Sequence, residues 1–154
     1  MILRFLLVLT AILLMRVDAM ADDKLASVQV KPVKLSMTFK GLRNTKGKIL
    51  VGLFNSEKGF PKEADAALKR ISVTLEERVV PRIEISRLSP GSYAVSALHD
   101  ENDNQKLDTN WIGIPREGVA ASRDAKGSFG PPKYRDAVLE ISQDQEIELT
   151  FDYM

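Results

Sequence analysis

The stretch KLSMTFKGLRNTKGKILVGLF, residues 34–54, has the pattern of two strands separated by a turn. Its first part alternates apolar and polar side chains, with Leu35, Met37 and Phe39 on one face, which is the period of a half-buried strand. Its last part, residues 49–54, is apolar on both faces, as expected of a strand inside a sheet. The segment between them contains Gly and Asn, which favour turns. This stretch therefore predicts a protein built from sheets.

The rest of the chain continues with short strands. The nine residues at 62–70 are rich in alanine and are expected to form one short helix across an end of the sheets. Pro81 cannot donate a hydrogen bond to a neighbouring strand, which indicates a sheet edge or a break at that point. Further strands are expected at residues 71–75, 82–86, 93–98, 137–141 and 146–153. The prediction is an all-β fold, an antiparallel β-sandwich of about seven strands with the strand 93–98 in its centre.

The composition is that of an ordinary globular chain. It has 154 residues, of which 44% are hydrophobic and 28% charged, and this size is typical of one domain. The 22 basic and 21 acidic residues give a net charge of +1, which argues against nucleic acid as a partner. The chain has no cysteine and one histidine, so disulfides, thiol catalysis and sites with two imidazole groups are excluded.

Residues 1–21, MILRFLLVLTAILLMRVDAMA, have the organisation of a secretory signal peptide. Arg4 supplies the positive charge, and the apolar run of 11 residues at 5–15 is too short for a bilayer span, which needs about 20. Small residues favour cleavage after Ala21, with cleavage after Ala19 or retention as an N-terminal anchor as the alternatives. We therefore expect a periplasmic or secreted protein with no stable membrane span after cleavage.

Removal of that segment leaves a short N-terminal stretch and one long domain. Residues 22–33 are expected to be a flexible segment, and residues 34–154 a single β-sandwich domain. Within the domain, residues 100–136 have little regular pattern. Because loops of this length are uncommon in compact domains and are usually functional, this loop is the expected place of a site.

The long loop begins with DENDNQKLD, which places oxygen-bearing side chains at alternating positions. We interpret Asp100, Asn102, Asn104 and Asp108 as side-chain ligands of a Ca²⁺ ion, and Lys106 as a ligand through its backbone carbonyl. These residues occupy positions 1, 3, 5, 9 and 7 of an EF-hand-like loop, which turns alternate oxygens toward a hard cation. Position 6 is glutamine and position 12 is tryptophan, where an EF-hand has glycine and a bidentate glutamate.

The two aspartates give this ligand set a formal charge of only −2, so Ca²⁺ is expected to bind weakly, with a Kd of about 10⁻⁴ to 10⁻³ M. Glu101, Asp103 or Glu117 is a candidate to complete the coordination. The alternative is a metal-free loop in which the Asp and Asn side chains form Asx turns with their own backbone.

Two neighbouring features allow different interpretations. His99, at the end of a predicted strand, is expected to make a structural hydrogen bond, and the alternative is a role as ligand or general base. Trp111 and Ile112 are expected to plug the end of the sandwich. Alternatively, Trp111 stacks on a sugar or a peptide.

The expected function is a non-catalytic binding or scaffold module with an unknown ligand or protein partner. No serine lies in a GxSxG context, and a single histidine would have to serve any nucleophile, so the sequence contains no evident nucleophile–base pair. The alternative is a metal-dependent hydrolase that uses the acidic loop and His99.

An ordered set of segments resembles the bacterial domain-of-unknown-function 2141 family. The set includes GKILVGLFN at 47–55 and LSPGSYAVSALHDENDNQKLDTNWIGIPREG at 88–118. The resemblance covers about residues 34–154 and implies an exported β-sandwich of immunoglobulin-like or transthyretin-like kind, without an assigned activity. In the family the loop is closer to HDENGNGKLD, so Asp103 and Gln105 stand in this chain where the family has glycine.

Overall fold

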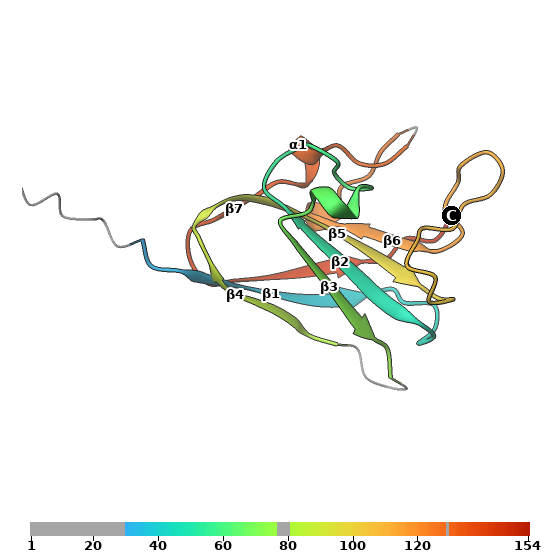
Figure 1. Cartoon of the computed structure of the whole chain (residues 1–154), viewed down its shortest axis with the longest axis horizontal. Coiled ribbons are helices and arrows are strands. Elements are labelled where there is room, and N and C mark those ends of the chain that lie inside the picture. Colours follow the sequence, from blue (N-terminus) through green and yellow to red (C-terminus); the bar gives the residue numbers. More distant parts are fainter. Residues whose placement is uncertain (1–29, 77–80, 129) are drawn as a thin grey trace, which may run out of the picture.

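The computed structural model describes residues 30–76, 81–128 and 130–154, whose strands form two sheets packed against one another (Figure 1). The first sheet consists, in spatial order, of β4 (Ile83–Leu88), β1 (Val33–Lys40) and β8 (Gln145–Thr150). The second consists of β3 (Lys69–Thr74), β2 (Lys48–Phe54), β5 (Gly91–Asp100) and β6 (Gly118–Ala121), with β7 (Leu139–Ile141) beside another part of β5. The helices in the described residues are single turns, namely η1 (Ala64–Ala66), η2 (Ser122–Asp124) and α1 (Tyr134–Ala137). The predicted all-β fold is confirmed.

The core lies between the sheets and follows the alternation of the sequence. The predicted inner face of β1 is confirmed, since Leu35, Met37 and Phe39 are all buried. Ile49 and Val51 of β2 are buried in the same apolar cluster. Each side chain of this size contributes about 1.5–3 kcal/mol when it is fully removed from water. The cluster is continued from β4, β5, β7 and the C-terminal segment by Ile83, Ile85, Tyr93, Val95, Ala97, Ile141, Leu149 and Phe151.

One pair of strands is parallel, which corrects the prediction of a wholly antiparallel sandwich. β8 runs parallel to β1, whereas the other pairs between strands of the described residues are antiparallel. The turn before β8 lies beside the start of β1, where the backbone N–H of Lys34 donates to the Asp144 carboxylate over 2.8 Å. Because β8 starts at that end, it runs in the same direction as β1.

The predicted helix at 62–70 is wrong. Only Ala64–Ala66 form a single 3₁₀ turn, which has no side-chain cap, and β3 already begins at Lys69. An isolated helix of about nine residues is marginal in water. Lys69 and Arg70 instead pair with Leu53 and Gly52 of β2, and this sheet pairing replaces the weak helix.

Two further elements differ from the sequence-based expectation. Of the predicted strand 137–141, only β7 is a strand, because Ala137 belongs to α1. The predicted irregular loop 100–136 contains β6, which pairs with β5. With four residues, GVAA, β6 is too short to show a period of two.

The position of β5 confirms that the strand 93–98 is central. One edge of β5 pairs with β2 along its length, and the other pairs with β7 and then β6. β4, the strand after Pro81, lies at the edge of its sheet, as the proline indicates. Because β5 ends at Asp100, the acidic loop that follows it lies at one end of the sandwich.

The predicted signal peptide at 1–21 lies outside the described residues, as do residues 22–29 of the expected N-terminal segment. Among the residues that the structure describes, no helix has the length and hydropathy needed to cross a membrane.

Candidate functional site

Asp100, the last residue of β5, holds the acidic loop from inside the protein. Its side chain is fully buried. Its two carboxylate oxygens accept hydrogen bonds from the backbone N–H groups of Asn104, at 3.1 Å, and Gln105, at 2.8 Å. Such bonds to an ionised carboxylate are stronger than those between neutral groups, so the loop is held back against the end of β5.

The side chains of Asn102, Asn104 and Asp108 meet above this turn. Oδ1 of Asn102 accepts the backbone N–H of Asn104 at 3.1 Å, and Oδ1 of Asn104 accepts that of Lys106 at 2.9 Å. These are the Asx turns of the metal-free alternative. The two amide groups donate to the Asp108 carboxylate over 2.6 and 3.0 Å. The structure thus brings three predicted ligand side chains into direct contact, while the side chain of Lys106 is exposed.

The donor groups of this loop suit a hard cation only in part. In the described part of the chain, no three or more His, Cys, Asp or Glu side chains lie together in a way that could hold a metal ion. Coordination would therefore require amide and backbone oxygens as well as carboxylates, a mixture that Ca²⁺ accepts. An amide oxygen has two lone pairs, so Oδ1 of Asn102 or Asn104 can hold a backbone N–H and a cation together.

Glu117 closes the loop at its other end. Its side chain is buried, with Oε1 accepting the backbone N–H of Glu101 at 3.0 Å and Oε2 accepting that of Asp108 at 3.0 Å. One carboxylate therefore joins both ends of the acidic segment. The sequence offered Glu117 only as a possible extra ligand, because nothing in its local pattern shows that it folds back under residues 101–108.

Arg43, in the turn between β1 and β2, braces the same end of the sandwich. Its guanidinium binds both carboxylate oxygens of Glu101, at 2.6 and 2.7 Å, and donates to the backbone carbonyl of Arg116 at 2.9 Å. This hydrogen-bonded cation lowers the pKa of Glu101. The sequence analysis did not identify Arg43, since a single arginine in a turn carries no signal for a partner 58 residues away.

His99 is buried in the same region and both of its ring nitrogens have partners. Nε2 lies 2.8 Å from the carbonyl oxygen of Lys46, which can only accept, so Nε2 carries a hydrogen. Nδ1 lies 2.6 Å from the hydroxyl of Tyr153, which in turn accepts the backbone N–H of Arg43 at 3.3 Å. Burial is the main cause that raises the pKa of Tyr153. The expected structural hydrogen bond of His99 is therefore present.

A short turn at residues 110–115 projects beyond the acidic loop and carries the single tryptophan of the chain. Oδ1 of Asn110 accepts the backbone N–H groups of Ile112, at 3.1 Å, and Ile114, at 2.9 Å. The N–H of Gly113 donates to the carbonyl of Asn110 at 3.0 Å, and the N–H of Asn110 to that of Ile114 at 2.8 Å. Residues 111–115, the apolar tip, thus sit on an internally bonded backbone.

The expectation that Trp111 and Ile112 plug the end of the sandwich is wrong. The side chain of Trp111 is 93% exposed and that of Ile112 57% exposed. The end of the sandwich is filled instead by residues from elsewhere in the chain, among them His99 and Phe151, whose rings lie 6.0 Å apart. The local sequence cannot distinguish these two outcomes, because an apolar residue after a loop fits either one.

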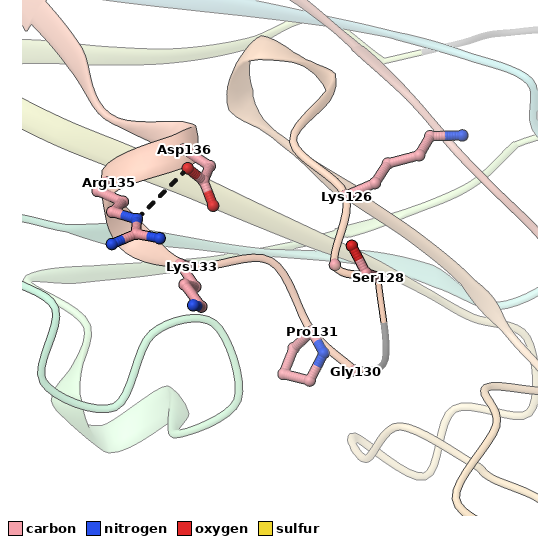
Figure 2. Close-up of a pocket in the computed structure, with 8 residues that line it drawn as sticks. Lys126, Ser128, Gly130, Pro131, Lys133, Arg135 and Asp136 are labelled. Carbon is pink, nitrogen blue, oxygen red and sulfur yellow. Dashed lines mark ion pairs between the residues drawn. The ribbon is translucent and has the colours of Figure 1, made fainter.

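A separate surface hollow of about 460 Å³ lies between η2 and α1 and is lined mainly by polar and basic residues (Figure 2). Three of its four charged groups already have partners, since Lys126 pairs with Asp152 at 2.7 Å and Arg135 with Asp136 at 3.7 Å. Figure 2 shows that the amino groups of Lys126 and Lys133 do not converge on one point. The described residues that line the hollow therefore show no convergent set of groups for a ligand.

Comparison with known families places the chain in one bacterial family. The model of the family described as an uncharacterized protein conserved in bacteria (DUF2141) matches residues 37–148. The chain belongs to this family. No curated protein and no solved structure matches it. The matched range contains the acidic loop, Glu117 and the apolar tip, so all three are parts of the DUF2141 domain.

Two residues of the acidic loop in this DUF2141 domain have unusual backbone angles. Asp103 and Gln105 have φ values of 61° and 62°. These angles lie in the left-handed region, which glycine adopts freely and other residues adopt at a cost of about 1–2 kcal/mol. The two residues therefore hold a backbone conformation that favours glycine, and Asp103 forms an ion pair with Lys48 at 2.7 Å.

Proposed function

We propose that this DUF2141 protein is an exported, non-catalytic binding module that contacts its ligand through the apolar tip. The observation that carries this proposal is the 93% exposure of Trp111 on a turn whose backbone is internally hydrogen-bonded. Large aromatic side chains are costly to leave in water and are enriched in the centres of binding surfaces. Residues 1–21, with the composition of a signal peptide, support export to the periplasm or the medium.

The acidic loop and its braces hold the apolar tip in place. Both chain segments that lead to the tip are fixed, since Glu117 holds the N–H of Asp108 at 3.0 Å and the N–H of Arg116 donates to the carbonyl of Asp108 at 2.9 Å. A bridge between Thr109 and Pro115 continues this pairing outward. Because little flexibility is lost when such a turn binds, a small contact surface is sufficient for a useful affinity.

The alternative function, a metal-dependent hydrolase that uses the acidic loop and His99, has less support. A general base must reach a substrate proton with a free ring nitrogen. In this structure both ring nitrogens of His99 are held, by Tyr153 at 2.6 Å and by the carbonyl of Lys46 at 2.8 Å, and the ring is buried. A scaffold or binding role requires no such group.

Replacement of Trp111 by alanine is expected to weaken binding strongly without loss of stability. Wild-type protein should sediment with the envelope fraction of the producing bacterium. Trp111→Ala should bind about 30-fold more weakly, as for an aromatic anchor worth about 2 kcal/mol. The melting temperature should change by no more than about 2 °C, because exposed substitutions stay within about 0.5 kcal/mol.

The matched control for this experiment is Leu68→Ala, which removes an exposed apolar side chain just before β3, at the opposite end of the sandwich. It should bind like the wild type. Envelope binding that Trp111→Ala leaves intact would contradict the proposed contact. Turnover of ester, glycoside or phosphoester substrates that is lost in Asp100→Ala would favour the hydrolase instead.

We further propose that Ca²⁺ binds weakly in the acidic loop and stabilises it. Asp100, Asn102, Asn104 and Asp108 supply the side-chain oxygens, and Lys106 supplies its backbone carbonyl. The support is the closeness of the asparagine amides to the Asp108 carboxylate, at 2.6 and 3.0 Å, and the backbone turns that fold the loop around them. The ion would replace the contacts between the amides and Asp108 and hold the loop from its centre.

Calcium is therefore expected to raise the melting temperature. An ion that binds only the folded state adds about 2.7 kcal/mol of stability at 100 times its Kd, which amounts to several degrees for a domain of this size. Asp108→Ala should abolish this shift, since it removes half of the formal ligand charge, while Lys106→Ala should retain it. Thermal melts of each variant in calcium and in chelator test this. A wild-type melting temperature that stays constant up to about 10 mM calcium contradicts the site.

A further inference from the structure

The apolar tip concentrates exposed hydrophobic side chains more strongly than any other part of the described structure. Six large hydrophobic residues are exposed in the described residues, and three of them lie within four consecutive positions. These are Trp111, Ile112 and Ile114, with exposed fractions of 93%, 57% and 38%. Of the other three, Val30 and Met154 are the first and last described residues, and Leu68 lies alone just before β3. Exposed apolar residues gathered at one point indicate an interaction site.

The tip is a convex projection from one end of the sandwich (Figure 1). Its successive backbone N–H groups at Ile112, Gly113 and Ile114 are all bonded within the turn. Because three of the four backbone N–H groups of the tip are bonded in this way, the cost of unpaired donors in an apolar phase is reduced. The same bonding leaves few directional donors with which a protein partner could be selected.

Two exposed cations flank the tip. No charged residue occurs between residues 109 and 115. Asp108 and Arg116 border this uncharged segment, and Lys106 lies two positions before Asp108. The carboxylates of the acidic loop are all hydrogen-bonded or ion-paired within the protein, whereas Lys106 and Arg116 are exposed. Neither side chain makes an ion pair within the part of the chain that the structure describes. An apolar apex with free cations behind it matches a bilayer surface, whose acyl chains lie beneath a layer of anionic headgroups.

We propose that the ligand of the apolar tip is the surface of an anionic lipid bilayer. This inference rests on the proposed binding function and names its partner. Trp111 lies at the level of the headgroups, where amphipathic aromatic rings are favoured, and Ile112 and Ile114 enter the adjoining acyl region. Lys106 and Arg116 face the anionic headgroups. The contact is shallow and reversible, because three apolar side chains and two charges are far fewer than a permanent anchor needs.

Because the chain contains a single tryptophan, its fluorescence reports directly on the environment of the tip. Purified protein without residues 1–21 is mixed with vesicles of phosphatidylcholine that contain about 30 mol% phosphatidylglycerol, or none. With the anionic vesicles the tryptophan emission should shift to shorter wavelength, and lipids brominated near the headgroup should quench it. The protein should also sediment with these vesicles, and less so in high salt.

Charge and apolar variants separate the two parts of the contact. The pair Lys106→Ser and Arg116→Ser should weaken binding to anionic vesicles roughly 25-fold, at about fivefold for each cation. The matched control, Lys58→Ser with Lys62→Ser, changes the net charge equally in the connection between β2 and β3, at the far end of the sandwich, and should bind like the wild type.

The possible outcomes distinguish this inference from the proposed function. Equal binding to neutral and anionic vesicles overturns the role of the two cations. No emission shift and no sedimentation with either vesicle overturns the lipid inference. If binding to the envelope fraction still depends on Trp111 in that case, the binding function stands and the partner is a protein or a polysaccharide. If both kinds of binding are absent, the proposed function fails as well.

Discussion

Gly47→Ala is expected to lower the stability of the protein by about 4 kcal/mol, or roughly 15 °C in melting temperature. Gly47 lies immediately before β2 at a φ of +70°. A Cβ atom there would overlap the carbonyl oxygen of Asp100 and lie 2.9 Å from the carbonyl carbon of Glu101. Left-handed strain of about 1–2 kcal/mol would then add to the cost of moving the end of β5.

The change would also disturb the candidate site, because the backbone that must move is the one that begins the acidic loop. Gly113→Ala is the matched control, since Gly113 has a φ of +84° but no atom lies within 4 Å of its Cβ position. It should cost only the backbone strain, about 1–2 kcal/mol. Calorimetry of both variants checks the prediction, and equal losses would show that the contact between Gly47 and the end of β5 contributes nothing.

Asp100→Asn is expected to cost about 3 kcal/mol, or roughly 10 °C in melting temperature, measured in chelator so that calcium makes no contribution. The buried carboxylate accepts one backbone N–H with each oxygen, from Asn104 at 3.1 Å and from Gln105 at 2.8 Å. An amide of the same shape offers only one acceptor and places a donor opposite the other N–H group. One charge-assisted bond is lost, the other is weakened, and two donors are forced together.

Asp103→Asn provides the comparison, because it is the same chemical change three residues along the loop. The Asp103 side chain is half exposed and its ion pair with Lys48, at 2.7 Å, is of the kind that contributes at most about 1 kcal/mol. Asparagine also tolerates the left-handed φ of 61° at this position. Similar losses of stability in the two variants would mean that Asp100 does not hold the loop in the way that its burial indicates.

The secondary structure was predictable wherever it depended on neighbouring residues. The alternation at Leu35, Met37 and Phe39 correctly identified the inner face of β1, and the two-sided apolar pattern at 49–54 correctly placed β2 inside a sheet. The helix at 62–70 was wrong because composition alone ignores the pairing of Lys69 with β2. β6 was missed because four residues are too few to show a period.

The candidate site was predictable in position but not in its contacts. The spacing of acidic and amide residues located the loop after β5, and the structure brings Asn102, Asn104 and Asp108 together there. The hydrogen bonds that the Glu117 carboxylate accepts from the backbone of residues 101 and 108 were not evident from the sequence, since they depend on how the chain returns into β6. The exposure of Trp111 was likewise not predictable from the sequence, because an apolar residue after a polar loop can be either buried or exposed.

Local spacing in the sequence thus identified most of the strands, the apolar faces of β1 and β2 and the start of the acidic loop. The parallel pairing of β8 with β1, the burial of Asp100 and the exposure of Trp111 became evident only from the three-dimensional arrangement. These outcomes depend on contacts between distant residues, such as Arg43 with Glu101, 58 positions apart, and His99 with Tyr153, 54 positions apart. Such contacts form only when the two sheets pack, since it is the shared core that brings their strand ends together.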